Sequence, residues 1–260
     1  MIKTCVVIGS GNVATHLATA LAPYVEILQI FSRDILHARE LADRISSSCV
    51  ATNDVTAICP NADLYLMSVA DDSIASLLQQ IPCLNNDGIW VHTSGSVGVD
   101  VFVELRGHFG VFYPLQTFSK HKAVDMKSVP FFIEGSSSFV EKCLLDLAGK
   151  ISDNVRLLNS EGRRRLHVAA VFACNFVNYM WVVADRQLRL CGTDIHALDP
   201  LLKETMEKIT TLSPAEAQTG PARRGDKHII DSHIKMLSGD DAQLYEILSN
   251  QIYKTYHEQN

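Results

Sequence analysis

The stretch VVIGSGNVATHL, residues 6–17, decides the fold of this 260-residue chain. An apolar run stops at Gly9, a second glycine follows at Gly11, and a pattern typical of a helix then begins. Gly9 to Ala14 fits G-x-G-x-x-A, where the glycines permit a tight turn and a close approach of phosphate, and the small last residue lets helix pack on strand. The stretch predicts a strand, a turn and a helix whose amino end binds a dinucleotide phosphate. The alternative is a tight turn in a ligand-free α/β fold.

Strand-like and helix-like segments alternate over the first 150 residues. The strands are apolar throughout, which is typical of a parallel sheet with both faces covered. We therefore predict an α/β Rossmann fold with a doubly wound, mostly parallel sheet. The expected strands are residues 2–9, 25–32, 49–51, 62–70, 88–96, 110–115 and 129–135, and the expected helices include 12–23, 34–44 and 139–151.

The strand pattern stops after about residue 155, and helical patterns follow to the end. We predict a nucleotide-binding Rossmann domain over residues 1–155 and an all-α helical domain over 156–260. In the first domain Ser32 and Asp34 are predicted to cap the helix that runs to residue 44. In the second domain the predicted helix caps and stops are Ser160, Gly192, Asp199, Ser213 and Asp226.

The second strand ends in IFSRD, where dinucleotide-binding proteins read the ribose. An acidic residue there holds the 2′-hydroxyl of NAD, whereas an arginine accepts the 2′-phosphate of NADP. Ser32 and Arg33 occupy this place, and a hydroxyl beside a guanidinium suits a phosphate. We therefore predict NADP, a preference that weakens if Asp34 turns inward.

Two later strands end in small and polar residues, SVADD and HTSGS. Ligands of such sheets bind beyond the carboxyl ends of the strands, so both ends are expected to line the cofactor cleft. His92 would relay a proton or bind substrate; the alternative is a structural histidine bonded to backbone. The predicted cofactor-binding residues are Gly9, Ser10, Gly11, Asn12, Val13, Ser32, Arg33, Val69, Ala70, Thr93, Ser94 and Gly95.

Composition excludes some classes of protein. The net charge of −6 argues against nucleic-acid binding, which depends on Lys and Arg neutralising phosphates. The basic cluster Arg163-Arg164-Arg165 is interpreted as the solvated first turn of a helix. The seven cysteines are not closely paired, which is typical of reduced thiols, and the amino terminus runs straight into a strand without a signal-peptide pattern. We expect a cytoplasmic protein.

No metal is expected, because His228 and His233 do not share a helical face and lack a third ligand.

Residues 168–184 form a nearly apolar run that carries Asn175 and Asn178. A membrane span needs roughly 20 apolar residues. A helix apolar on all sides also forms the buried centre of a bundle or a dimer. We predict the buried helix and no membrane partner.

The motifs GSGNVATHL, SVADDSI, HTSGS, YPLQTFS, HVAAVFACNFVNY and TGPARRGD follow one another in this order. Together they resemble a family of NADP oxidoreductases in which a Rossmann domain precedes a helical domain of unknown function. That family is similar in architecture to pyrroline-5-carboxylate reductases, deazaflavin-dependent NADP reductases and the 6-phosphogluconate dehydrogenase group. The resemblance covers almost the whole chain and implies an NADP site and a homodimer built on the helical domains.

Candidate catalytic groups lie in the long helix. At 100° per residue, His167 and Asn178 share a face and Asn175 lies at its edge. His167 is the predicted proton donor, because histidine titrates near neutrality. Asn175 is the predicted partner of a substrate carbonyl or nicotinamide amide, and Asn178 a substrate contact. The alternative is that these groups bond other helices.

The motif TGPARRGD interrupts two helices, and its glycines and proline predict a fixed turn. Arg224 and Asp226 are predicted substrate contacts, since an arginine suits an acidic substrate; the alternative is a plain connection with Asp226 as a cap.

Related dehydrogenases place a catalytic lysine in the long helix, four residues before an asparagine, where this chain has Val171. A mechanism that uses that lysine is therefore not expected.

Two functions remain open. The first is an NADP-dependent oxidoreductase that transfers a hydride between NADP(H) and a small polar carbonyl or imine compound bound between the two domains. The second is a non-catalytic NADP(H)-binding sensor or regulatory protein, which the missing lysine favours.

Overall fold

The computed structural model describes residues 1–82, 87–104 and 107–258. Cys83, counted among the thiols above, lies outside these ranges. The chain divides into two compact units, Met1–Cys174 and Asn175–Asn260. The strands end at Leu157, close to the predicted domain boundary, but the contact-defined units meet inside the long helix. The boundary near residue 155 stays a prediction.

The first unit is built on one eight-stranded sheet in the order β3-β2-β1-β4-β5-β6-β7-β8. All neighbouring strands are parallel except β6 and β7. The doubly wound, mostly parallel α/β fold is therefore confirmed. The strands are β1 Thr4–Ile8, β2 Glu26–Phe31, β3 Val50–Thr52, β4 Leu64–Met67, β5 Ile89–His92, β6 His108–Pro114, β7 Phe131–Gly135 and β8 Val155–Leu157.

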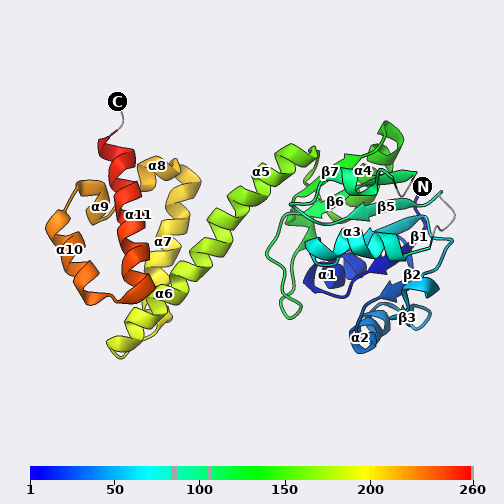
Figure 1. The fold of residues 1–260 in the computed structure, drawn as a ribbon, viewed down its shortest axis with the longest axis horizontal. Coiled ribbons are helices and arrows are strands. Elements are labelled where there is room, and N and C mark those ends of the chain that lie inside the picture. Colours follow the sequence, from blue (N-terminus) through cyan, green and yellow to red (C-terminus); the bar gives the residue numbers. More distant parts are fainter. Residues whose placement is uncertain (83–86, 105–106, 259–260) are drawn as a thin grey trace. The chain divides into compact units, whose positions relative to one another are not determined.

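Helices cover both faces of this sheet (Figure 1). One core joins α1, α2 and α4 to the sheet, and a second core joins α3 and the 3₁₀ turn η2 to the opposite face. Two covered faces explain why the strands are apolar at consecutive positions rather than at alternate ones. The helical elements are α1 Asn12–Leu21, α2 Ile35–Ile45, α3 Asp71–Gln80, α4 Ser138–Ile151, and the 3₁₀ turns η1 Val55–Ala57, η2 Val99–Phe102 and η3 Met126–Ser128.

The carboxyl ends of the central strands meet at one edge of the sheet. Ile8 of β1 pairs with Met67 of β4, Met67 pairs with His92 of β5, and His92 pairs with Val111 of β6. Strand order reverses beside β1, whose neighbours are β2 and β4. Open α/β sheets bind ligands outside such an edge, at the point of reversal.

The second unit is helical, as predicted, but it has almost no interior of its own. Among its described residues only Ala222 and Ser249 are buried. The long helix that leads into it consists of α5 Ser160–Ala170, the π-helical segment η4 Val171–Phe176 and α6 Val177–Leu190. The remaining elements are η5 Ile195–Leu198, α7 Asp199–Thr211, α8 Pro214–Ala217, α9 Pro221–Arg224, α10 Lys227–Met236 and α11 Gly239–His257.

The continuous helix Ser160–Leu190 is the one candidate for a membrane span within the described residues, by its length and composition alone. The core helix of a soluble protein passes the same test, so this is weak evidence. None of its most apolar window is buried. The described residues of the single chain therefore do not bury this helix, and its burial in a dimer stays a prediction.

The helix caps were predicted with mixed success. Asp34 caps α2 and Ser213 forms a capping box, as expected. Ser160 does not cap the long helix; Asn159 does, by accepting from the N–H of Gly162 at 2.9 Å. The two later aspartates also fail as side-chain caps, because Asp199 is already inside α7 and Asp226 uses its carboxylate in an ion pair.

Candidate active site

The turn between β1 and α1 has the backbone that its glycines predict. Gly9 has a φ of 124°, which an L side chain rarely adopts. A Cβ there would also collide with the carbonyl oxygen of Ser68, the residue after β4. Gly9 therefore lets the two central strands end side by side at the edge where ligands bind.

The amino end of α1 is suited to an anion. Gly11 is the N-cap, no side chain caps the helix, and the first turn holds no acidic residue. A Cβ on Gly11 would meet no heavy atom within 4 Å, so the space in front of the helix is open. The free N–H groups and the helix dipole then attract a phosphate.

The end of β2 lies against this turn. The hydroxyl of Ser10 donates to that of Ser32 at 2.8 Å. Arg33 is exposed beside them. The carboxylate of Asp34 is occupied as a helix cap, since it accepts from the N–H of Leu36 at 2.8 Å. The condition that would have weakened the NADP prediction, an inward-turned Asp34, is not met.

A segment after β6 packs on the first turns of α1. The N–H of Lys120 donates to the side-chain oxygen of Asn12 at 3.2 Å, and Nε2 of His16 lies 2.9 Å from the carbonyl oxygen of Ser119. This places the YPLQTFSK segment beside the amino end of α1. The predicted cofactor residue Asn12 therefore uses its side-chain oxygen to hold a neighbouring segment.

His92 serves the fold. It is fully buried, its Nδ1 accepts from the N–H of Ser94, and its Nε2 faces the carbonyl oxygen of Gly98. Burial lowers the pKa of His92 to about 4, helped by the positive charge of Arg163. These backbone contacts fit the structural alternative, and the role of His92 toward a proton or a substrate stays a prediction.

The other predicted residues at the strand ends differ in exposure. Val69 and Thr93 are half-buried, Ala70 is exposed, and Ser94 and Gly95 are buried. The Thr93 hydroxyl donates to the Ser68 hydroxyl at 3.2 Å, which joins the ends of β5 and β4.

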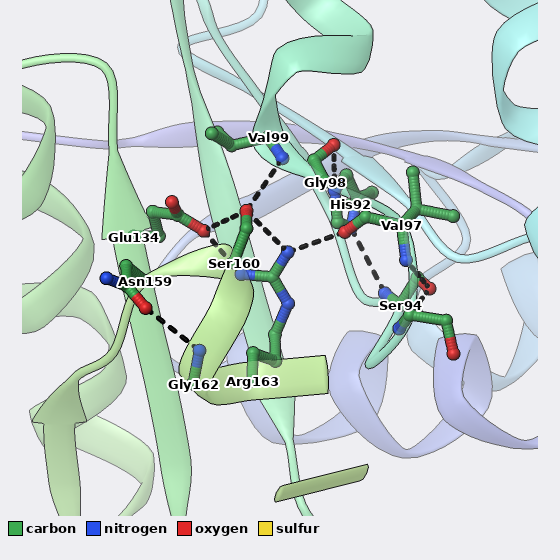
Figure 2. Close-up of polar contacts among 11 residues, drawn as sticks. His92, Ser94, Val97, Gly98, Val99, Glu134, Asn159, Ser160, Gly162 and Arg163 are labelled. Atoms are coloured by element: carbon green, nitrogen blue, oxygen red, sulfur yellow. Dashed lines mark hydrogen bonds and ion pairs between the residues drawn. The ribbon is translucent and has the colours of Figure 1, made fainter. Parts of the chain in front are cut away.

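The side chain of Arg163 extends from the start of α5 and contacts the loop after β5 (Figure 2). Its buried guanidinium contacts the Glu134 carboxylate of β7, the Val97 carbonyl oxygen and the Ser160 hydroxyl. Ser160 in turn donates to Glu134 at 2.7 Å and accepts from the N–H of Val99 at 3.0 Å. A paired buried charge of this kind ties the start of α5 to the loop that carries HTSGS.

His167 lies one turn further along α5, at the same sheet edge. Its Nδ1 is 3.0 Å from the hydroxyl of Tyr113, near the end of β6. A Cβ on Gly95 would lie 2.5 Å from that nitrogen, so only glycine lets the HTSGS loop pass here. His167 itself is half-buried. The structure therefore brings His167 together with the predicted cofactor residue Gly95.

Asn175 and Asn178 are exposed, and no described residue hydrogen-bonds their side chains. The π-helical segment between His167 and Asn178 places more residues in a turn than an α-helix does. The predicted shared face of His167 and Asn178 depended on uninterrupted α-helical spacing, which this segment breaks. The predicted roles of Asn175 and Asn178 remain untested.

Arg224 and Asp226 are brought together, but with each other. Nε of Arg224 donates to the Asp226 carboxylate at 2.8 Å, and both side chains are more than a third exposed. Gly220 and Gly225 take φ values of 105° and 76°, so the predicted fixed turn is present. Their role toward a substrate stays a prediction.

Sequence reasoning missed three residues of this region. Tyr113 reads as a core residue of an apolar strand, Arg163 as part of a solvated basic cluster, and Lys120 as loop. The only signal was that Arg163 shares α5 with His167 at a spacing of four, which is one helical turn.

Within the described ranges, no group of three or more His, Cys, Asp or Glu side chains could hold a metal ion.

Comparison with known proteins places this architecture. A domain of unknown function, DUF2520, matches residues 129–252. A crystal structure from Bacteroides fragilis, named as a putative NADP oxidoreductase, is 41% identical with a TM-score of 0.91, covering 97% of this chain and 98% of that one. The comparison with curated proteins finds no match.

More distant solved structures share the fold. A protein from Thermotoga maritima is 21% identical with a TM-score of 0.70, over 98% of each chain. A reductive aminase from Aspergillus terreus, solved with NADPH and ethyl-5-oxohexanoate, is 12% identical with a TM-score of 0.70, over 98% of this chain and 95% of that one.

Proposed function

This chain belongs to the NADP oxidoreductase family of the Bacteroides fragilis protein, and from that premise we propose that it is an NADP-dependent reductase of a small polar carbonyl or imine compound. The coarser assignment, an NADP-linked oxidoreductase, follows from the family. The substrate class is the part that we propose.

One observation carries the proposal: the amino end of α1 is open, uncapped and free of acidic side chains behind the G-x-G-x-x-A turn. The backbone N–H groups after Gly11 would hold the diphosphate, and Ser32 with Arg33 would hold the 2′-phosphate of NADP. The similar folds solved with NADPH or NADP⁺ support this choice of cofactor.

Reduction of a carbonyl or imine needs a hydride and a proton. A bound NADPH supplies the hydride, and the protein must orient the substrate and move the proton. His167 is the proposed proton donor, because it is half-buried at the carboxyl edge of the sheet beside Gly95. Asn175 is the proposed partner of the substrate carbonyl.

That the substrate binds between the two domains stays a prediction. That the protein is cytoplasmic stays a prediction as well. We also propose a homodimer built on the helical unit. The exposed apolar side chains of that unit support it, among them Val182, Ile209 and Ile247. A second copy of the chain would cover them.

A sensor that binds NADP(H) without turnover is the second candidate, favoured by Val171 at the position where related dehydrogenases have a lysine. Thermal shift with NADPH, NADH and neither, followed by a screen of carbonyl and imine compounds for NADPH oxidation, separates the two. The proposal predicts turnover that His167→Gln abolishes while NADPH binding stays. NADPH binding without turnover on any compound, in either protein, would establish the sensor instead.

A further inference from the structure

We propose that Tyr113 is the positioning residue of His167: its hydroxyl holds Nδ1 of the imidazole, so that Nε2 is the nitrogen that donates the proton. The inference rests on the proposed function, because it assigns a second residue to the same reaction.

The geometry around His167 distinguishes its two ring nitrogens. The Tyr113 oxygen lies 3.0 Å from Nδ1, and the two rings meet edge to face with centroids 6.2 Å apart. Gly95 closes the same side, since even a Cβ there would lie 2.5 Å from Nδ1. Within the described residues, nothing hydrogen-bonds Nε2. One nitrogen is therefore held by the protein and the other is available.

The acid form of the ring makes the assignment chemically definite. In the imidazolium both nitrogens carry protons and donate. Nδ1–H then donates to the Tyr113 oxygen, and Nε2–H is left for the substrate. The carbonyl carbon gains a hydride from the reduced nicotinamide while the carbonyl oxygen gains the Nε2 proton. The products are an alcohol, the oxidised nicotinamide and a neutral imidazole, which solvent reprotonates; an imine gives an amine in the same way.

Tyr113 is a poor proton donor in its own right. Tyr113 is 7% exposed, and burial raises its pKa to about 12. The negative charge of Asp71 acts in the same direction, while the positive charge of Arg163 opposes it. Arg163 lies one turn before His167 on α5 and is paired with Glu134, so it does not compete for Nδ1. The hydroxyl keeps its proton near neutral pH and serves as a fixed polar partner.

The decisive variant is Tyr113→Phe, which removes the hydroxyl and keeps the ring. Tyr65→Phe is the matched control, because Tyr65, like Tyr113, is a buried tyrosine in a strand. Its hydroxyl, however, donates to the backbone oxygen of Cys59 at 2.9 Å and not to a histidine. We expect Tyr113→Phe to lower kcat by about 10- to 100-fold, the range for a lost contact to a charged group, with KM and the NADPH dissociation constant unchanged. Tyr65→Phe should change none of these.

A second readout does not depend on activity. In histidine-labelled protein at low pH, NMR should show a downfield, slowly exchanging Nδ1 proton of His167 that disappears in Tyr113→Phe and in His167→Gln. Absence of that signal from the wild type would overturn the inference. So would loss of all turnover in Tyr113→Phe with turnover retained in His167→Gln, which would make the tyrosine the donor. A protein that shows the signal but reduces no compound would refute the proposed function and leave the positioning of His167 intact.

Discussion

The two units of this chain bury their apolar side chains very differently. The sheet unit has a continuous core on each face of its sheet. The helical unit, over its described residues, buries only Ala222 and Ser249, while side chains such as Val182 and Met236 are exposed. A unit with a core is stabilised from within, whereas a unit of amphipathic helices without one needs another protein surface. The first unit therefore has a rigid interior on which a site can be built, and the second is where we expect a second copy to bind.

The largest expected effect tests the interior of the sheet unit. Arg163→Met leaves the carboxylate of Glu134 without its buried partner, which should lower the free energy of unfolding by about 3–5 kcal/mol. Chemical denaturation measures this. The double variant Arg163→Met/Glu134→Leu is the control and should recover most of the loss. If the single variant is as stable as the wild type, the buried pair does not support the loop after β5.

The pH dependence of stability tests the same interior at His92. Its pKa is lowered to about 4, whereas an unfolded histidine titrates near 6.5. The unfolded state therefore binds the proton more tightly, so the stability is fully present above pH ~6.5 and falls as the pH drops toward 4. The difference corresponds to roughly 3 kcal/mol.

Urea unfolding between pH 7 and pH 4 measures this loss for the wild type and for His92→Asn. Other groups titrate in this range as well, so the comparison of the two proteins is the informative quantity. The variant should lose less stability across the interval than the wild type. Equal slopes for the two proteins would mean that His92 is not held neutral.

The cofactor assignment is tested without touching the core. Arg33→Ala should weaken NADPH binding by about 10- to 100-fold, the value of a charged hydrogen bond, and leave NADH binding unchanged. Arg39→Ala, an exposed arginine on the neighbouring α2, is the control. Isothermal titration gives both constants. An equal loss for NADPH and NADH would show that Arg33 does not read the 2′-phosphate.

The smallest effect on stability is expected for an exposed apolar residue in each unit. The two variants compare the units directly, because only one of the two residues is expected to lie in a dimer interface. Val182→Glu in α6 and Leu36→Glu in α2 should each change the stability of the single chain by less than about 0.5 kcal/mol. Only the Val182 variant should change the mass measured by sedimentation, from dimer to monomer. A wild type that sediments as a monomer would refute the proposed assembly.

The sequence predicted what depends on local pattern. The tight turn between β1 and α1 follows from Gly9 and Gly11, the parallel sheet from its uninterrupted apolar strands, and the capping of α2 from Asp34. Each of these signals lies within a few neighbouring residues, where backbone geometry and side-chain chemistry decide the outcome.

What the sequence did not reveal depends on contacts between distant residues. Tyr113 and His167 are 54 positions apart, and nothing in an apolar strand marks a tyrosine as the partner of a helix histidine. Ser160 is a residue type that often caps helices, but its hydroxyl donates to Glu134, and Asn159 is the N-cap of the helix. The π-helical segment has no pattern of its own, so the shared face of His167 and Asn178 could not be judged from spacing alone.

The most direct test of the central claim is NADPH binding by Gly11→Val. The wild-type residue has a φ of −75°, and a Cβ there would meet no heavy atom within 4 Å, so the variant should fold and lose no more than about 1 kcal/mol of stability, the cost of valine at an N-cap. Its side chain would fill the space in front of α1 where we place the diphosphate. Isothermal titration should show tight NADPH binding by the wild type and none by the variant. A folded Gly11→Val that binds NADPH as tightly as the wild type would contradict it.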